Sequence, residues 1–182
     1  MSENAKYLET FGDWIRELGN DAEEMGELLS DAALPSDAQE AIAGGLNYMF
    51  KSLDLIPDGI DDIGYLDDAF ILRVACGLAS NEDLAGLSAE HLQTLGRLSN
   101  GVDLIREFLG AEYDRLEGYV KAQRRAAARG RAVADIVGAE DVRAEFLSDV
   151  RGFARTYEAP GFAREEKNLI KLKAFFDAKL PR

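Results

Sequence analysis

The chain has 182 residues, of which 47% are hydrophobic and 30% are charged, and its formal net charge at pH 7 is −13. This length and composition predict one globular domain, residues 1–182, with a substantial core. A single cysteine excludes an intramolecular disulfide, and the sequence shows neither a signal peptide nor an apolar run long enough for a membrane span, so we expect a cytoplasmic protein.

The charge is unevenly distributed along the chain. Residues 1–91 hold 4 basic and 20 acidic residues, whereas residues 92–182 hold 17 basic and 14 acidic residues. An acidic half argues against nucleic acid or an anionic membrane as the main partner. It would serve solubility, or it would attract cations or a basic protein.

The first predicted helix covers residues 3–30 and repeats glycine every seven residues, at Gly12, Gly19 and Gly26. The stripe would let another helix approach closely, or it is a coincidence. The opposite face of this helix is acidic, and we expect it to face solvent. Its acidic residues include Asp13, Glu17, Asp21 and Glu24.

A second helix is predicted to start with a capping box formed by Ser36 and Gln39. Its buried stripe would consist of Ile42, Leu46, Met49 and Leu53. A third helix, about residues 65–79, is apolar on nearly every side, which is typical of a buried helix. We therefore expect an all-α bundle of six or seven helices with this helix at its centre.

The remaining predicted helices follow the same periodicity. One is capped by Ser88 and turns Leu92, Leu95, Leu98, Val102 and Ile105 inward. Three others are expected over residues 112–129, 139–157 and 164–180. The sequence predicts no strand.

The segment between the second and third helices, residues 50–68, has the most unusual composition. It reads FKSLDLIPDGIDDIGYLDD and, after Phe50, interleaves six aspartates with seven apolar residues. Pro57 should stop the preceding helix before Ile56, and Gly59 and Gly64 permit tight turns. A loop this apolar is expected to press onto the core, with aspartates satisfying its backbone N–H groups.

Two runs of this segment, Ser52–Asp58 and Gly64–Asp68, resemble the signature of the YkvA-like family. The chain has Asp54, Leu55, Ile56, Pro57, Asp58, Gly64, Asp67 and Asp68 at matching positions. It departs at Ser52 and Asp61, where the family usually has proline. The resemblance covers about residues 41–79. It implies a helical domain of a mainly bacterial family without an established biochemical function.

Four of the aspartates, Asp54, Asp58, Asp67 and Asp68, are candidate ligands for one cation. Mg²⁺, Mn²⁺ and Ca²⁺ prefer oxygen ligands, and the spacing differs from that of an EF-hand. The alternative is that these carboxylates cap turns and the start of the third helix, so that the protein has no cofactor. Capping is the reading that we favour from the sequence.

His91 and Cys76 are the other residues with catalytic chemistry. His91 lies in the first turn after Ser88 and is expected to be exposed. The sequence contains no nucleophile elbow that would make it part of a triad. Cys76 lies on an apolar helix face, which indicates an inert core thiol. We assign no catalytic residue.

A basic run without any acid extends from residue 118 to residue 134. Its cations would bind phosphate, anionic lipid at a membrane surface, or an acidic protein surface. The simplest partner is the acidic half of this protein, in the same chain or in a second copy. The cations are Lys121, Arg124, Arg125, Arg129 and Arg131.

These observations favour a non-enzymatic helical protein that acts through protein contacts or has a structural role. The alternative is a divalent-cation-binding protein, or a metal-dependent phosphoester hydrolase, that uses the carboxylates between Asp54 and Asp68. The glycine stripe and the uneven charge would also suit self-association.

Overall fold

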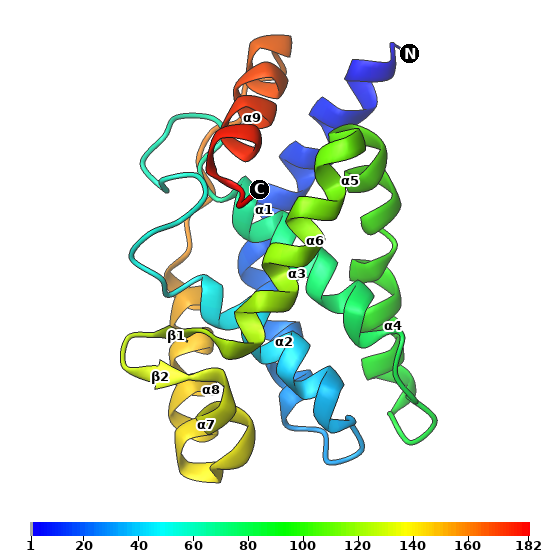
Figure 1. Ribbon diagram of the computed structural model, residues 1–182, viewed down its shortest axis with the longest axis vertical. Coiled ribbons are helices and arrows are strands. Elements are labelled where there is room, and N and C mark those ends of the chain that lie inside the picture. Colours follow the sequence, from blue (N-terminus) through cyan, green and yellow to red (C-terminus); the bar gives the residue numbers. More distant parts are fainter. Residues whose placement is uncertain (1) are drawn as a thin grey trace.

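Helices assemble around one central helix in the computed structural model, which describes residues 2–182 (Figure 1). The α-helices are α1 (Glu3–Leu29), α2 (Ser36–Tyr48), α3 (Leu66–Ala79), α4 (Ala89–Ser99), α5 (Val102–Leu109), α6 (Tyr113–Ala122), α7 (Val133–Gly138), α8 (Glu140–Thr156) and α9 (Glu166–Lys179). Two 3₁₀-helices, η1 (Gly110–Glu112) and η2 (Gln123–Arg125), and a hairpin of β1 (Ala127–Ala128) and β2 (Arg131–Ala132) complete the described elements. The predicted all-α class is confirmed.

Helix α3 is the centre of the fold, as its all-round apolar pattern predicts. Every residue from Leu66 to Cys76 is buried. The helix packs against α1, α2, α4, α5 and α6. The Phe70 ring lies 4.9 Å from that of Phe11 on α1 and 5.3 Å from that of Phe176 on α9. The first and last helices are therefore joined through α3.

Helix α8 and the segment that follows it pack against the glycine stripe of α1. A Cβ atom at Gly26 would lie 3.4 Å from Val150, one at Gly19 would lie 3.3 Å from the Ala154 carbonyl, and one at Gly12 would lie 3.1 Å from Phe162. Close approach of a second helix is thus confirmed. Because the approaching helix belongs to the same chain, the stripe is not open to a second copy.

Two expectations for α2 are wrong. Its N-cap is Pro35, and the Gln39 side chain donates to the Leu34 carbonyl at 2.9 Å rather than closing a capping box. The helix also ends at Tyr48, because the chain turns there and the Tyr48 hydroxyl accepts a hydrogen bond from Leu55 N. Leu53 consequently lies outside the helix and is 83% exposed instead of buried.

The second half of the chain forms shorter helices than its periodicity indicates. Ser88 does cap α4, accepting from His91 N at 3.2 Å, but Leu92 is 42% exposed instead of facing inward. The helix expected over residues 112–129 ends at Ala122, and the β1–β2 hairpin follows it. Arg129 and Gly130 both have positive φ, of 50° and 76°, which is the backbone of a tight hairpin turn.

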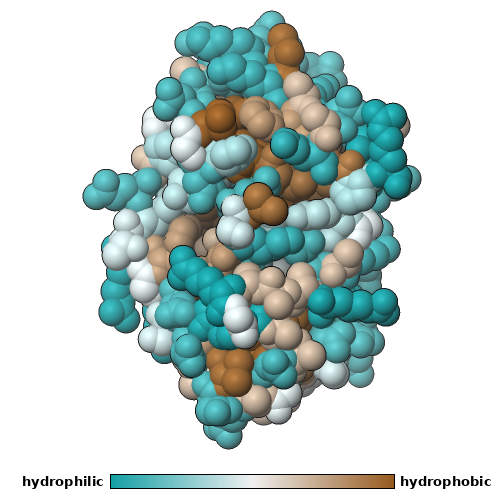
Figure 2. Space-filling view, turned by 60° about the vertical axis from the view of Figure 1, so that its left-hand side comes forward, coloured by the Kyte–Doolittle hydropathy of each residue, from teal (hydrophilic) through white to brown (hydrophobic). Residues whose placement is uncertain are grey.

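Hydrophilic residues cover most of the face shown in Figure 2, and hydrophobic residues form separate patches among them. None of the helices within residues 2–182 combines the length and the apolar character that crossing a membrane requires.

Helix α2 approaches α3 through Gly45, and this contact gives a testable prediction. A Cβ atom at Gly45 would lie 2.7 Å from the Ala75 Cβ, so Gly45→Ala should lower the free energy of unfolding by about 1–3 kcal/mol through overpacking. Gly96 lies within α4 with no atom within 4 Å of its missing Cβ. Gly96→Ala is the control and should stabilise the protein by about 0.5–1 kcal/mol through helix propensity. Urea unfolding of both variants measures the two signs, and a stable Gly45→Ala would contradict the α2–α3 packing.

Candidate metal centre

The aspartate loop, residues 49–65, connects α2 to α3 and presses onto the core as predicted. Leu55, Ile56 and Ile63 are 4%, 0% and 0% exposed. Asp62 and Tyr65 have positive φ, of 69° and 70°, so the loop folds back sharply just before α3. Gly64 sits at this turn, where a Cβ atom would overlap the Asp58 carbonyl and lie 2.9 Å from that of Ile60. Only glycine fits there.

The loop is fastened to the start of α3 by Tyr48 and Asp67. The Tyr48 hydroxyl donates to Asp67 Oδ2 at 2.6 Å and accepts from Leu55 N at 2.6 Å. Ile56 N donates to the same Asp67 oxygen at 3.2 Å. Asp67 therefore satisfies loop backbone, as the capping interpretation expects, although it caps the loop rather than the first turn of its own helix.

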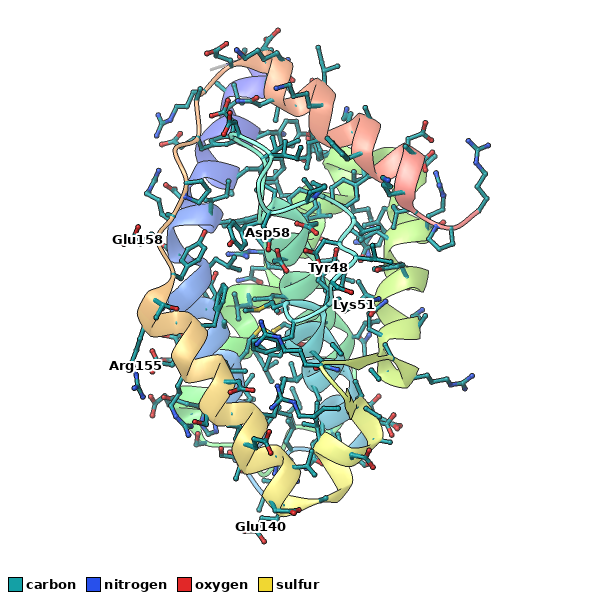
Figure 3. The ribbon with its side chains drawn as sticks, turned by 90° about the vertical axis from the view of Figure 1, so that its left-hand side faces the viewer. Tyr48, Lys51, Asp58, Glu140, Arg155 and Glu158 are labelled. Carbon is teal, nitrogen blue, oxygen red and sulfur yellow. The ribbon has the colours of Figure 1, made fainter. Side chains whose placement is uncertain are left out.

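Three carboxylates meet at this point. One oxygen from each of Asp58, Asp67 and Asp68, which we call the acidic cluster, lies within 4.8 Å of the others. Asp67 and Asp68 are 0% and 3% exposed, whereas Asp58 lies on the exposed side of the loop. In Figure 3, Asp58 and Tyr48 lie near each other in the middle of the molecule, with Lys51 close by.

Several oxygens of this region have no hydrogen-bond donor. Asp67 Oδ1, Asp68 Oδ2 and Asp54 Oδ1 are buried and unpartnered. Within residues 2–182, no lysine or arginine forms an ion pair with Asp54, Asp58, Asp67 or Asp68. Buried polar groups almost always have partners. These oxygens are therefore buried acceptors that a proton, a water molecule or a cation would satisfy.

The raised pKa values of these carboxyl groups also indicate negative charge without a nearby counter-charge. Burial, together with the charges of Asp67 and Asp58, raises the pKa of Asp54 to about 7. Burial raises the pKa of Asp67 to about 6, and burial with the neighbouring carboxylates raises the pKa of Asp68 well above its usual range. Burial also raises the pKa of Asp58. Near neutral pH, this site needs either protons or a cation to offset its charge.

The sequence interpretation assigned backbone capping to Asp54 and Asp58 as well. Neither carboxylate accepts a hydrogen bond from any residue that the structure describes, because Tyr48 and Asp67 already bind the nearby N–H groups of Leu55 and Ile56. Capping therefore explains Asp67 but leaves Asp54 and Asp58 without that role.

The remaining sequence candidates lie elsewhere. His91 is half-buried rather than exposed, because its Nδ1 lies 2.6 Å from Asp31 Oδ2. Cys76 is fully buried, which confirms its place in the core, and burial raises the pKa of its thiol to about 12.

The basic run divides into paired and unpaired cations. Arg131 is only 8% exposed, lies over the Phe146 ring and pairs with Asp149 at 2.7 Å. Lys121 pairs with Glu117 at 2.7 Å. Both partners belong to the C-terminal half, so the expectation of pairing with the acidic N-terminal half is wrong for these two. Arg124, Arg125 and Arg129 form no ion pair with any described residue.

Sequence reasoning missed two features of the centre of the fold. Tyr48 gave no signal beyond an aromatic residue near a helix end. The ion pair between Arg73 Nη2 and Asp21 Oδ2, at 2.9 Å, is fully buried, although Asp21 was assigned to a solvated face. Arg73 inside an otherwise apolar helix was the available signal.

Comparison of this chain with protein-family models, with curated proteins and with solved structures finds no match. The geometry of the chain itself therefore carries the functional argument.

Proposed function

We propose that this chain binds one divalent cation, Mg²⁺, Mn²⁺ or Ca²⁺, through the acidic cluster, with Asp54 as a further ligand or counter-charge. The observation that carries the proposal is the convergence of Asp58, Asp67 and Asp68 within 4.8 Å, together with the buried unpartnered oxygens of Asp67 and Asp68. Hard divalent cations take oxygen ligands of this kind.

The electrostatic balance of the site supports a cation. Burying an ionised carboxylate without a partner costs several kcal/mol, and neighbouring like charges add to that cost. Among the described residues, Lys51 is the only cation whose charge lowers the pKa of Asp54, and it forms no ion pair with the acidic cluster. A bound cation would offset the charge that no described side chain offsets.

The burial of the ligands favours a structural cation. Asp67 and Asp68 are buried under the loop, so only Asp58 is open to solvent. A cation here would link the loop, through Asp58, to α3, through Asp67 and Asp68. A phosphoester hydrolase needs room at the metal for substrate and water, so we place it second to a non-enzymatic role.

We also propose a family and a cellular compartment for this chain. We place the chain in the YkvA-like family over residues 41–79, which is supported by the fact that its four motif aspartates gather in one region. We further propose a cytoplasmic protein that acts through protein contacts on a surface whose loop geometry the cation fixes. The single buried thiol fits a reducing compartment.

The cation should raise the melting temperature of the wild-type protein at pH 7.5. A ligand at about 100 times its Kd contributes about 2.7 kcal/mol, which corresponds to a rise of about 5–10 °C for a chain of this size.

Asp58→Asn should lose most of the rise, since it removes one ligand from the exposed side. Asp61→Asn is the matched control, because Asp61 lies exposed in the same loop and outside the cluster. Calorimetry after chelator treatment and addition of each cation measures these shifts, and an equal rise in Asp58→Asn and wild type would contradict the proposal.

Both the stability of the cation-free protein and the cation-induced rise in melting temperature should depend on pH. Folding raises the pKa of Asp54 to about 7 and that of Asp67 to about 6, from ordinary values of about 4. The folded state then holds more protons than the unfolded state between about pH 4 and pH 7, so this contribution to the stability of the cation-free protein falls as pH rises through that window. At pH 5 protons already offset the charge, and the cation-induced rise should be smaller than at pH 7.5. Asp54→Asn should flatten the fall in stability.

A further inference from the structure

A shallow groove on the side of α2 collects three cations of the basic run, of which Arg124 and Arg125 form no ion pair with a described residue and Lys121 pairs with Glu117. It lies between α2, the end of α6, η2 and α7 and has a volume of about 960 Å³. Three of its lining side chains are cationic and one is acidic. The lining residues are Glu40, Lys121, Ala122, Arg124, Arg125 and Ala134. The groove therefore has an excess of positive charge in a chain whose formal net charge is −13.

The backbone that carries these arginines is held firmly in place. Gly44 on α2 lets η2 pack closely, because a Cβ atom there would lie 3.2 Å from the Gln123 carbonyl carbon and 3.3 Å from Arg124 N. Gln123 is 4% exposed, and its side chain donates to the Tyr119 carbonyl and accepts from Lys51 Nζ. A fixed backbone presents the guanidinium groups at low entropic cost, which is a property of binding sites.

Arg124 and Arg125 are two cations of the fold that have no carboxylate partner among the described residues and that share one groove. Arg131, Arg97 and Arg115 each pair with a carboxylate. Arg124 and Arg125 form no ion pair with any residue from 2 to 182, and Arg124 Nε is buried without an acceptor. A desolvated donor without an acceptor is costly. Nε itself is closed to solvent, so an anion in the groove would act on the rest of the Arg124 guanidinium and on the exposed Arg125 side chain as their counter-charge.

We propose that this groove binds the phosphate group of a phosphorylated small molecule. A phosphate monoester carries about −1.5 to −2 charges at pH 7 and has three acceptor oxygens, which suits two unpaired arginines better than a singly charged carboxylate does. The inference is independent of the acidic cluster, since none of the residues lining the groove belongs to it.

Titration calorimetry with inorganic phosphate and with pyrophosphate tests the proposal, at low salt and in excess chelator so that a bound metal cannot hold the anion. Wild type should bind both saturably and bind acetate at least about tenfold more weakly. Arg124→Gln and Arg125→Gln should each weaken phosphate binding about tenfold, the loss of one charge-assisted hydrogen bond. Arg155→Gln is the matched control, because Arg155 is exposed, unpaired among the described residues and also in the last turn of a helix. It should leave binding unchanged.

The outcomes separate the alternatives. Absence of saturable binding in wild type overturns the proposal, and so does an equal loss in Arg155→Gln, which would indicate attraction by surface charge alone. Vesicles containing phosphatidic acid distinguish the source of the phosphate. Binding of free pyrophosphate without retention on vesicles supports the proposed small molecule, whereas retention on vesicles without binding of the free anions overturns it in favour of a lipid surface.

Discussion

Replacing Arg73 with methionine should lower the free energy of unfolding by about 3–5 kcal/mol, the usual cost of removing one partner of a buried ion pair. Arg73 is 2% exposed. Its guanidinium donates to Asp21 Oδ2 at 2.9 Å and to the Ala69 carbonyl at 3.0 Å, and it lies 4.1 Å from the centre of the Trp14 ring. Methionine retains apolar volume but leaves the Asp21 carboxylate, which is 0% exposed, with one partner fewer.

Arg97 supplies the control for this prediction. Its Nη1 donates to the other Asp21 oxygen at 2.8 Å, but its side chain is 42% exposed. Arg97→Met should therefore cost only about 1 kcal/mol. The double variant Arg73→Met with Asp21→Leu should recover much of the loss, because no unpaired buried charge remains. Equal costs for Arg73→Met and Arg97→Met in urea unfolding would show that the buried pair is not what holds α1 to α3.

This pair also shows where sequence reasoning ends. The apolar surroundings of Arg73 place it in a buried helix, and a buried cation requires an acid. Which of the 34 acidic residues supplies it depends on how α1 rotates against α3. Helical periodicity leaves Asp21 at the margin of the apolar stripe, next to Ala22 and Leu18. Only the packing of the two helices decides that Asp21 turns inward.

The helices with a continuous apolar pattern were predictable from the sequence. α1, α3 and α8 bury one continuous set of apolar side chains, and their predicted boundaries agree with the structure to within about two residues, the usual spread in locating helix ends. The hairpin at residues 127–132 was missed because a run of alanine and arginine has high helix propensity, whereas Gly130 permits the turn that the fold requires.

The candidate site was predictable in its residues but not in its geometry. The composition of the loop identified Asp54, Asp58, Asp67 and Asp68. It did not show that Asp67 and Asp68 are buried, because that depends on the loop folding back over the start of α3. It also gave no sign that a tyrosine nineteen residues before Asp67 would reach its carboxylate.

Tyr48→Phe tests this last link and should lower the free energy of unfolding by about 2–4 kcal/mol. The variant keeps the ring in place, 6.0 Å from that of Tyr119, and removes only the hydroxyl. Leu55 N then loses its acceptor, and Asp67 Oδ2 loses one of its two donors. Each buried group left unsatisfied costs about 1–3 kcal/mol. Chemical unfolding in excess chelator measures this loss without any contribution from a cation.

Tyr119→Phe is the control, because the Tyr119 hydroxyl contacts only Lys51 Nζ, at 3.5 Å, among the described hydrogen bonds. It should cost less than about 1 kcal/mol.

The two variants should also differ in their response to cations. A hydrogen bond that orients a ligand carboxylate typically contributes a factor of about 10–100 to metal affinity. Tyr48→Phe should therefore need a correspondingly higher cation concentration to reach the wild-type gain in melting temperature, whereas Tyr119→Phe should follow the wild type. If Tyr48→Phe loses stability but keeps the wild-type cation response, Tyr48 fastens the loop without orienting Asp67 as a ligand. If Tyr48→Phe keeps both its stability and its cation response, then the hydrogen bond that Tyr48 donates to Asp67 and the one that it accepts from Leu55 N do not hold the loop on α3.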